Sequence, residues 1–307
     1  MNRLRISAIS YLNTAPLMWD FEHTAIGSQF DISYTLPSAC ARALSAGTAD
    51  IGIIPAVAYT QIPNLSILPG VAIASRRAVR SILLVSKIPV EQIRTVALDN
   101  SSMTSVALTK ILFAKFLGRA RDYSSASPDL EKMLAANDAA LLIGDPALQV
   151  DRSRYLTLDL AEEWIRFTGK PFVFAFWAVR QASLQDAALD EQESVEDETC
   201  GDSRPWLSAP LRGAGVEGSD LAAIFKHSRD HGLEPAHVDS IAREWSPRLG
   251  VPENAVRSYL TEAIYYSLDE PCLEGLQLFY RYAAEIGALP ALPSPLTFLN
   301  PSLVATP

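Results

Sequence analysis

The first 55 residues constrain the fold most strongly, because buried strands and short helices alternate in them. The stretches LRISAIS, from Leu4, and FDISYTLP, from Phe30, predict two strands, and a short helix is expected to begin at Pro16 between them. A second helix, with Ser38 as its expected N-cap and Gly47 as its end, leads into the apolar strand ADIGIIP. This β-α-β-α-β order predicts an α/β protein with parallel strands.

The same alternation continues as far as Arg180, after which the character of the chain changes. Further strands are expected in LSILPGVAIAS, VRSILLVSK, IRTVALDN, AALLIGDPAL and KPFVFAFWAVR, and a helix is expected after the polar stretch NSSMTS. Residues 186–218 combine acidic residues with glycine, proline and serine, a composition typical of a disordered insertion. Over residues 219–290 apolar residues recur at three-to-four spacing, which predicts helices.

The net charge of −9 is concentrated in one segment. Eight acidic residues and no basic ones lie between Asp186 and Asp202, and the rest of the chain carries 26 basic and 27 acidic residues. A nucleic-acid binder would need a basic stripe, so no such partner is expected. No apolar run reaches bilayer length and the N-terminus has no signal-peptide pattern, so we expect a cytoplasmic protein without a membrane partner. The scattered cysteines Cys40, Cys200 and Cys272 agree with a reducing compartment.

Uncharged polar side chains directly follow the first strand. Ser10, Tyr11 and Asn13 lie at its carboxyl end, where such groups would form one wall of a small-molecule site. Asn13 has a second interpretation, because asparagine often holds its own backbone in a turn, and from the residue alone that role is favoured. Ser81, in VRSILLVS, has a similar alternative, since a strand serine usually bonds to nearby backbone or water.

Thr104 and Ser105 end the polar stretch NSSMTS, which leads into a strong helix. Their hydroxyls and the free backbone N–H groups of the first turn could bind an anion at the positive end of the helix dipole. The alternative is that this stretch only caps the helix, and from this feature alone capping is favoured. Asp145, in IGDPAL, is either a ligand-binding carboxylate or the start of an Asp-Pro turn, and the residues leave both open.

Two histidines, His227 and His231, have the i, i+4 spacing that suits two metal ligands on one helix face. Glu234 and the other nearby acids give no convincing third ligand, so a solvated helix face is favoured and no metal site is expected. The sequence also lacks GxGxxG after a strand, GxxxxGK[ST], GxSxG and HExxH. We therefore expect no cofactor.

Five segments occur in an order that resembles one enzyme family, the chorismate dehydratases of the futalosine route to menaquinone. They are ISYLNTAPL, the pair PGVAIAS–VRSILLVS, VALDNSSMTS, AALLIGDPAL and TGKPFVFAFW. The resemblance covers residues 3–180 well and the final helices loosely. The acidic stretch after Asp186 is not part of the family pattern, and the family often has a glycine where this chain has Arg76 and Arg77.

The resemblance implies a fold like that of the type II periplasmic binding proteins, in which two α/β lobes close on a ligand, here with a helical C-terminal extension. The first lobe is expected to comprise residues 1–85 and 175–307, and the second residues 86–174. The chain would cross between them near SKIPV and return near TGKPFVFAF. The ligand would then lie where strand ends meet helix N-termini.

The activity that the resemblance implies is a carbon–oxygen lyase reaction, the loss of water from chorismate to give 3-[(1-carboxyvinyl)oxy]benzoate. Chorismate is the one partner expected, and the oligomeric state is not predicted. Asn13 and Ser81 would be catalytic, because they would hold the substrate so that its own side-chain carboxylate takes the ring proton. The residues expected to bind substrate are Ser10, Tyr11, Thr104, Ser105 and Asp145.

Three other functions are compatible with the same expected fold. A solute-binding protein without chemistry would be exported, and no signal-peptide pattern is present. The sister enzyme, dihydroxynaphthoate synthase, would be expected to carry a histidine in its cleft motifs, and the five segments have none. A regulatory ligand-binding domain would need an attached output segment, for which the sequence gives no indication.

Overall fold

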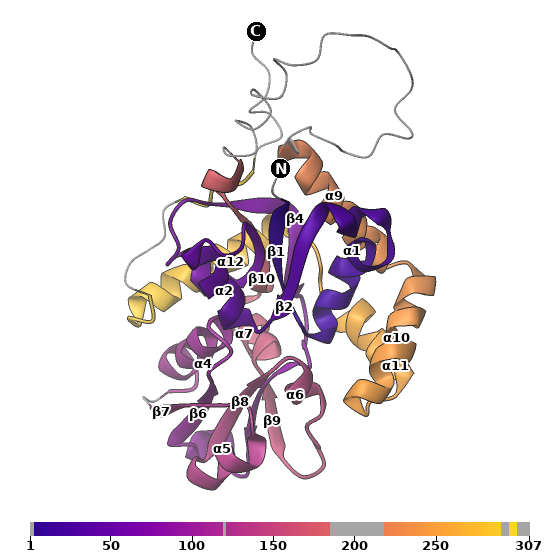
Figure 1. Cartoon of the computed structure of the whole chain (residues 1–307). Helices are drawn as coiled ribbons and strands as arrows, with labels where there is room; N and C mark the ends of the chain where they lie inside the picture. Colours follow the sequence, from indigo (N-terminus) through magenta and orange to yellow (C-terminus); the bar gives the residue numbers. More distant parts are fainter. Residues whose placement is uncertain (1–2, 119–120, 185–217, 290–294, 300–307) are drawn as a thin grey trace, which may run out of the picture.

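The computed structural model of the 307-residue chain describes residues 3–118, 121–184, 218–289 and 295–299 (Figure 1). The expected acidic insertion at 186–218 therefore lies, apart from its last residue, outside the described residues. The rest forms two separate five-stranded sheets with helices packed around them. In the described part of the chain, no helix is long and apolar enough to cross a membrane.

The first sheet mixes parallel and antiparallel strands. Its order is β2 (Phe30–Thr35), β1 (Leu4–Ile9), β3 (Ile51–Pro55), β10 (Phe172–Arg180) and β4 (Leu65–Ser75). The three strands from the N-terminal segment are parallel to one another, as the β-α-β pattern predicts. Strand β10 runs antiparallel to both of its neighbours. It is buried along almost its whole length, which explains its unbroken apolar sequence.

The second sheet has the order β7 (Asp122–Ala126), β6 (Thr95–Asp99), β8 (Ala139–Ile143), β5 (Ile82–Ser86) and β9 (Leu156–Asp159). Strand β5 pairs with β8 and β9, and all five of its residues are buried. By sheet membership the chain therefore passes from the first sheet to the second between Ser75 and Ile82, one strand earlier than expected. It returns between α7 and β10. The lobe limits themselves stay a prediction.

Helices and helical turns connect the strands of both sheets. In the N-terminal segment they are η1 (Leu12–Met18), α1 (Trp19–His23), η2 (Ala25–Gln29), α2 (Pro37–Ala46) and α3 (Ala56–Tyr59). Around the second sheet they are η3 (Val90–Gln92), α4 (Thr104–Lys115), α5 (Leu130–Ala136), α6 (Asp145–Leu148) and α7 (Leu160–Thr168). The C-terminal set is α9 (Gly218–Gly232), α10 (Pro235–Leu249), α11 (Glu253–Ser258), the π-turn η5 (Tyr259–Ala263) and α12 (Glu270–Glu285).

Two predicted helix starts are wrong. The first helical turn begins at Leu12, not at Pro16, because the Leu12 N–H already has a partner in the Asp145 carboxylate. Helix α2 begins at Pro37 with Leu36 as its N-cap, and the Ser38 N–H is instead satisfied by a distant backbone carbonyl. The predicted end of α2 is confirmed, since Gly47 has the left-handed conformation that glycine adopts readily.

The C-terminal helices return to the N-terminal half of the chain. Helix α9 packs against η1, α1 and β4, while α12 packs against β10 and α4. The buried Tyr280 hydroxyl donates a hydrogen bond to the Ala56 carbonyl (2.7 Å). The backbone of Tyr265 bonds to that of Ala74 in β4. These contacts bring side chains from the end of the chain to the junction between the two sheets.

Candidate active-site cleft

A small cavity lies where the two sheets face each other. Its apolar walls come from both sheets and include Ile9, Ile73, Ile82, Ile143 and Phe174. Its polar side chains are those of Tyr11, Asn13, Ser102, Thr104 and Ser105, and none of the described residues that line it carries a charge. The cavity volume is about 50 Å³. Ligand pockets usually measure roughly 300–1,000 Å³, so this cavity must widen before a ring-sized ligand enters.

Tyr11 covers one end of the cavity. Its ring lies against Gly144, where a Cβ atom would be only 2.6 Å from the ring and where φ is +62°, so both the close approach and the backbone require glycine. The Tyr11 hydroxyl is 3.5 Å from the Ser101 hydroxyl. Burial raises the pKa of Tyr11 to about 12, so the phenol stays neutral and keeps its proton to donate.

Asn13 lies in η1, is buried, and lines the cavity. Its side-chain oxygen accepts a long hydrogen bond from the Thr14 hydroxyl (3.4 Å). Ser10 has a different position, since it is exposed and its hydroxyl is 3.4 Å from the Thr35 carbonyl. Ser10 belongs to a separate groove that is also lined by Arg248.

Ser81 is fully buried beside the cavity and has a partner that the sequence did not reveal. The Tyr259 hydroxyl donates to the Ser81 hydroxyl at 2.8 Å. Burial raises the pKa of Tyr259, while its hydrogen bonds to Ser81 and Asn13 act in the opposite direction. Tyr259 thus links both expected catalytic residues. In its stretch, YLTEAIYY, the apolar residues have the spacing of a buried helix face. The sequence signal for a contact with Ser81 was therefore limited to a tyrosine hydroxyl on that apolar face.

Thr104 and Ser105 form the first turn of α4 and face the cavity. The residue before the helix, Met103, provides no side-chain cap. The Thr104 hydroxyl accepts a hydrogen bond from the Val57 N–H across the sheet junction (3.2 Å). The positive end of a 12-residue helix therefore opens on the cavity, as anion binding requires.

Asp145 connects the two sides of the junction. Its carboxylate accepts a hydrogen bond from the Leu12 N–H at 3.0 Å, and burial raises its pKa to about 6. It is not among the residues that line the cavity, and its observed contact fixes the start of η1, the turn that carries Asn13.

Asp99 is a second buried carboxylate that the sequence did not single out. It accepts hydrogen bonds from the Ser101 N–H (2.8 Å) and the Ser101 hydroxyl (2.7 Å), and burial raises its pKa. Because Ser101 also approaches the Tyr11 hydroxyl, Asp99 supports the cavity from behind without lining it.

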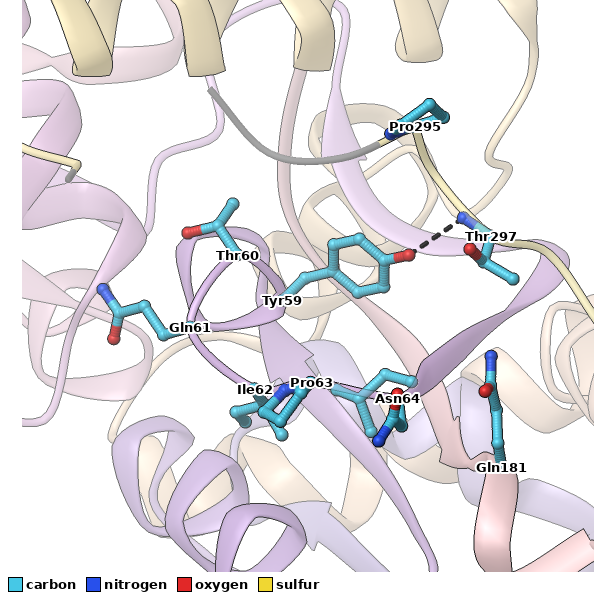
Figure 2. A pocket seen from close by; sticks show the side chains of 10 residues that line it. Tyr59, Thr60, Gln61, Ile62, Pro63, Asn64, Gln181, Pro295 and Thr297 are labelled. Atoms are coloured by element: carbon cyan, nitrogen blue, oxygen red, sulfur yellow. Dashed lines mark hydrogen bonds between the residues drawn. The ribbon is translucent and has the colours of Figure 1, made fainter. Parts of the chain in front are cut away.

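A larger pocket of about 430 Å³ lies elsewhere, beside α3 (Figure 2). Figure 2 shows the Tyr59 hydroxyl accepting a hydrogen bond from the Thr297 N–H (2.9 Å), with Asn64 and Gln181 below them in this view. None of the seven expected site residues lines this pocket. The cleft between the sheets is therefore the candidate site.

Residues 4–198 match the family model for menaquinone biosynthesis. The chain belongs to the menaquinone biosynthesis family. Within that range lie the five segments on which the resemblance rested, which is thereby confirmed at the level of the family. A chorismate dehydratase from Thermus thermophilus is 29% identical over 261 residues, which cover 79% of this chain and 93% of that protein.

Solved structures show the fold of this family member. A protein from Archaeoglobus fulgidus has a TM-score of 0.61 and 15% identity, with 94% of this chain and 98% of that chain covered. The periplasmic aliphatic sulphonate binding protein of Escherichia coli has a TM-score of 0.59 and 15% identity, with 95% of each chain covered. The predicted fold class, a two-lobed periplasmic-binding-protein-like fold with C-terminal helices, is confirmed.

Proposed function

We propose that this member of the menaquinone biosynthesis family is a chorismate dehydratase that converts chorismate to 3-[(1-carboxyvinyl)oxy]benzoate and water. The observation that carries the proposal is the uncharged cavity, in which Asn13 from η1 meets Thr104 and Ser105 from the first turn of α4. The similarity to the Thermus thermophilus enzyme over most of both chains supports the same activity.

The chemistry of chorismate suits such a site. Chorismate has a ring proton next to the enolpyruvyl ether and a hydroxyl on the neighbouring carbon. When the C–H bond breaks, its electrons form a ring double bond, and the C–O bond on the neighbouring carbon breaks. The departing hydroxyl takes up one proton and leaves as water. The ring becomes aromatic, so the enzyme has to orient the substrate and assist a poor leaving group.

The proton acceptor in this proposal is the carboxylate on the substrate's own side chain. No described residue that lines the cavity is an acid, a lysine, an arginine or a histidine. Asn13 and Ser81 would hold that carboxylate against the ring proton, and Tyr259 would hold Ser81. Correct orientation alone can lower a barrier by several kcal/mol.

The first turn of α4 would bind the other carboxylate. Thr104 and Ser105 offer hydroxyls there, and the backbone N–H groups behind them carry the positive end of the helix dipole. Neutral donors suit a dianionic substrate, because they orient it without adding a competing base to the cavity. Binding would require the sheets to move apart, since the cavity measures only about 50 Å³.

Mass spectrometry of a mixture of the purified protein and chorismate tests this proposal. The expected product is lighter by one water and retains the enolpyruvyl group. Unchanged chorismate together with saturable binding would instead indicate a binding protein, like the sulphonate-binding neighbour. Neither binding nor turnover would show that the fold is shared without the function.

A further inference from the structure

All four histidines of the chain gather in one place, away from the cleft cavity. His227 and His231 come from α9, His23 comes from α1, and His237 comes from α10. Trp19 stacks between His23 (3.9 Å between ring centroids) and His237 (4.3 Å). The sequence offered the pair on α9 as two metal ligands without a third, and the structure supplies that third residue.

Asp20, from α1, lies between the two histidines of α9. Its carboxylate is 2.7 Å from His227 Nδ1 and 2.5 Å from His231 Nδ1, although the residues are 207 and 211 positions apart in sequence. The Asp20 side chain is only 1% exposed. Burial acts to raise its pKa, but the hydrogen bonds from His231 and His227 outweigh this and hold the pKa below its ordinary value, so the carboxylate is charged at neutral pH.

The backbone holds this arrangement independently of the imidazoles. The Ser228 hydroxyl donates to the Leu17 carbonyl (2.9 Å) and accepts from the Asp20 N–H (3.0 Å), so α9 is fastened to α1 next to the cluster. At Gly232 a Cβ atom would lie 2.1 Å from the Pro16 carbonyl oxygen, so only glycine permits the close approach of α9 to η1. Contacts other than the three side chains therefore also hold α9 against α1 and η1.

We propose that Asp20, His227 and His231 bind a divalent cation of the zinc class, with water as the fourth ligand. Two imidazoles and one carboxylate are a ligand set typical of zinc. The three ligand atoms lie within 4.8 Å of one another. The ion would join α1 to α9 directly behind η1, the turn that carries Asn13.

The required rearrangement is small. Zinc bonds of about 2.0–2.1 Å at tetrahedral angles separate neighbouring ligand atoms by about 3.3 Å, so the two imidazoles must withdraw from Asp20 by less than about 1 Å. The His227 side chain is 70% exposed and His231 is 31% exposed. Both rings therefore have room to move, and the solvent side leaves the fourth position open to water.

Cobalt(II) is the probe that distinguishes this site from a hydrogen-bonded cluster, because tetrahedral cobalt absorbs visible light strongly. The untagged full-length protein is treated with a chelator, dialysed and titrated with cobalt(II), and zinc(II) is then added. We expect an absorption band that saturates at one equivalent of cobalt and disappears with zinc. Zinc should also raise the melting temperature.

Matched variants make the test specific. His227→Gln, at the most exposed ligand, should abolish the band and the zinc-dependent shift in melting temperature while the protein stays folded. Asp20→Asn should do the same. His23→Gln is the control, because His23 belongs to the cluster but its Nδ1 contacts the Trp19 carbonyl rather than Asp20. A band that never saturates, no band, or a band that survives His227→Gln would overturn the proposal.

Discussion

The chain from Tyr11 to His23 serves two regions of opposite chemistry. Its first part, with Tyr11 and Asn13, lines a cavity whose described walls contain no charged group. Its second part, with Asp20 and His23, enters a cluster that holds every histidine of the protein and a buried, ionised carboxylate. No acidic, lysine, arginine or histidine side chain is among the described residues that line the cavity, whereas all four histidines lie in the second region.

This contrast suggests how the two regions work. If the cleft acts as proposed, without an enzyme base, it works by orienting its substrate, and its side chains must then be held by their neighbours. The Ser228 hydroxyl of α9 supplies such a support from behind η1, since it donates to the Leu17 carbonyl, and Asp145 supplies another from the second sheet. The predictions below test the contrast, beginning with the variant expected to reduce turnover most.

Asn13→Ala should lower the turnover of chorismate more than about 100-fold, because loss of precise positioning can cost that much. Its melting temperature should change little. Asn13→Asp is the matched control: it keeps the size but adds a negative charge that repels a dianionic substrate, so it should be equally inactive. Steady-state kinetics and thermal melts measure both effects. An unfolded Asn13→Ala variant, or one with full activity, would contradict this role.

Ser81→Ala should lower turnover by about two orders of magnitude for the same reason. Tyr259→Phe should lower it about ten-fold, since it removes the hydroxyl that holds Ser81 at 2.8 Å. If Tyr259 acts through Ser81, the double variant should be no slower than Ser81→Ala alone. Tyr265→Phe is the control, because that hydroxyl bonds to Asp269 and not to the cleft. If the turnover losses of the two single variants add fully in the double variant, Tyr259 does not act through Ser81.

Ser105→Ala should raise KM about five-fold and leave kcat nearly unchanged, because a hydroxyl that binds the distant carboxylate contributes equally before and during the reaction. Ser10→Ala provides the comparison: its exposed side chain belongs to a different groove, so KM should stay the same. Initial rates over a range of chorismate concentrations give KM and kcat for both variants. A larger effect at Ser10 than at Ser105 would place the substrate in that other groove.

Asp145→Asn should affect turnover little and should change the pH dependence of stability. The folded-state pKa of about 6 lies above the ordinary value of 3.8, so the folded protein favours the protonated carboxyl. Its contribution to stability is therefore fully present below about pH 4 and is lost as the pH rises through 6.

Urea unfolding from pH 4 to pH 8 measures the change. Subtracting the free energies of unfolding of the variant from those of the unaltered protein should isolate a contribution that declines with pH. A difference that is constant with pH would mean that Asp145 titrates normally. A difference that grows with pH would mean that its folded pKa is lowered.

Much of the fold was predictable, because local sequence patterns indicate which stretches form strands and helices and which of their residues are buried. The parallel N-terminal strands, the strand before Asp145 and the C-terminal helices occur where the sequence indicated. By sheet membership the first crossing comes one strand earlier than expected. Strand β5 and the strand before it are both apolar, so the sequence does not show which sheet each joins.

The candidate site was predictable only in part. Asn13, Thr104 and Ser105 lie at the ends of local elements, and such positions can be read from a short stretch of sequence. Tyr259 and Asp20 could not be found in that way. Each meets its partner across about 180 to 210 residues, and the docking of the C-terminal helices brings them together.

The central claim is that the cleft dehydrates chorismate without an acid, a lysine, an arginine or a histidine among the described residues that line it. The most direct measurement is kcat for chorismate from pH 7 to pH 9, with the dehydrated product followed by mass spectrometry. A product one water lighter, formed at a rate that does not change over this range, is the predicted result. Unchanged chorismate, or a rate that follows the titration of a protein group, would contradict the account.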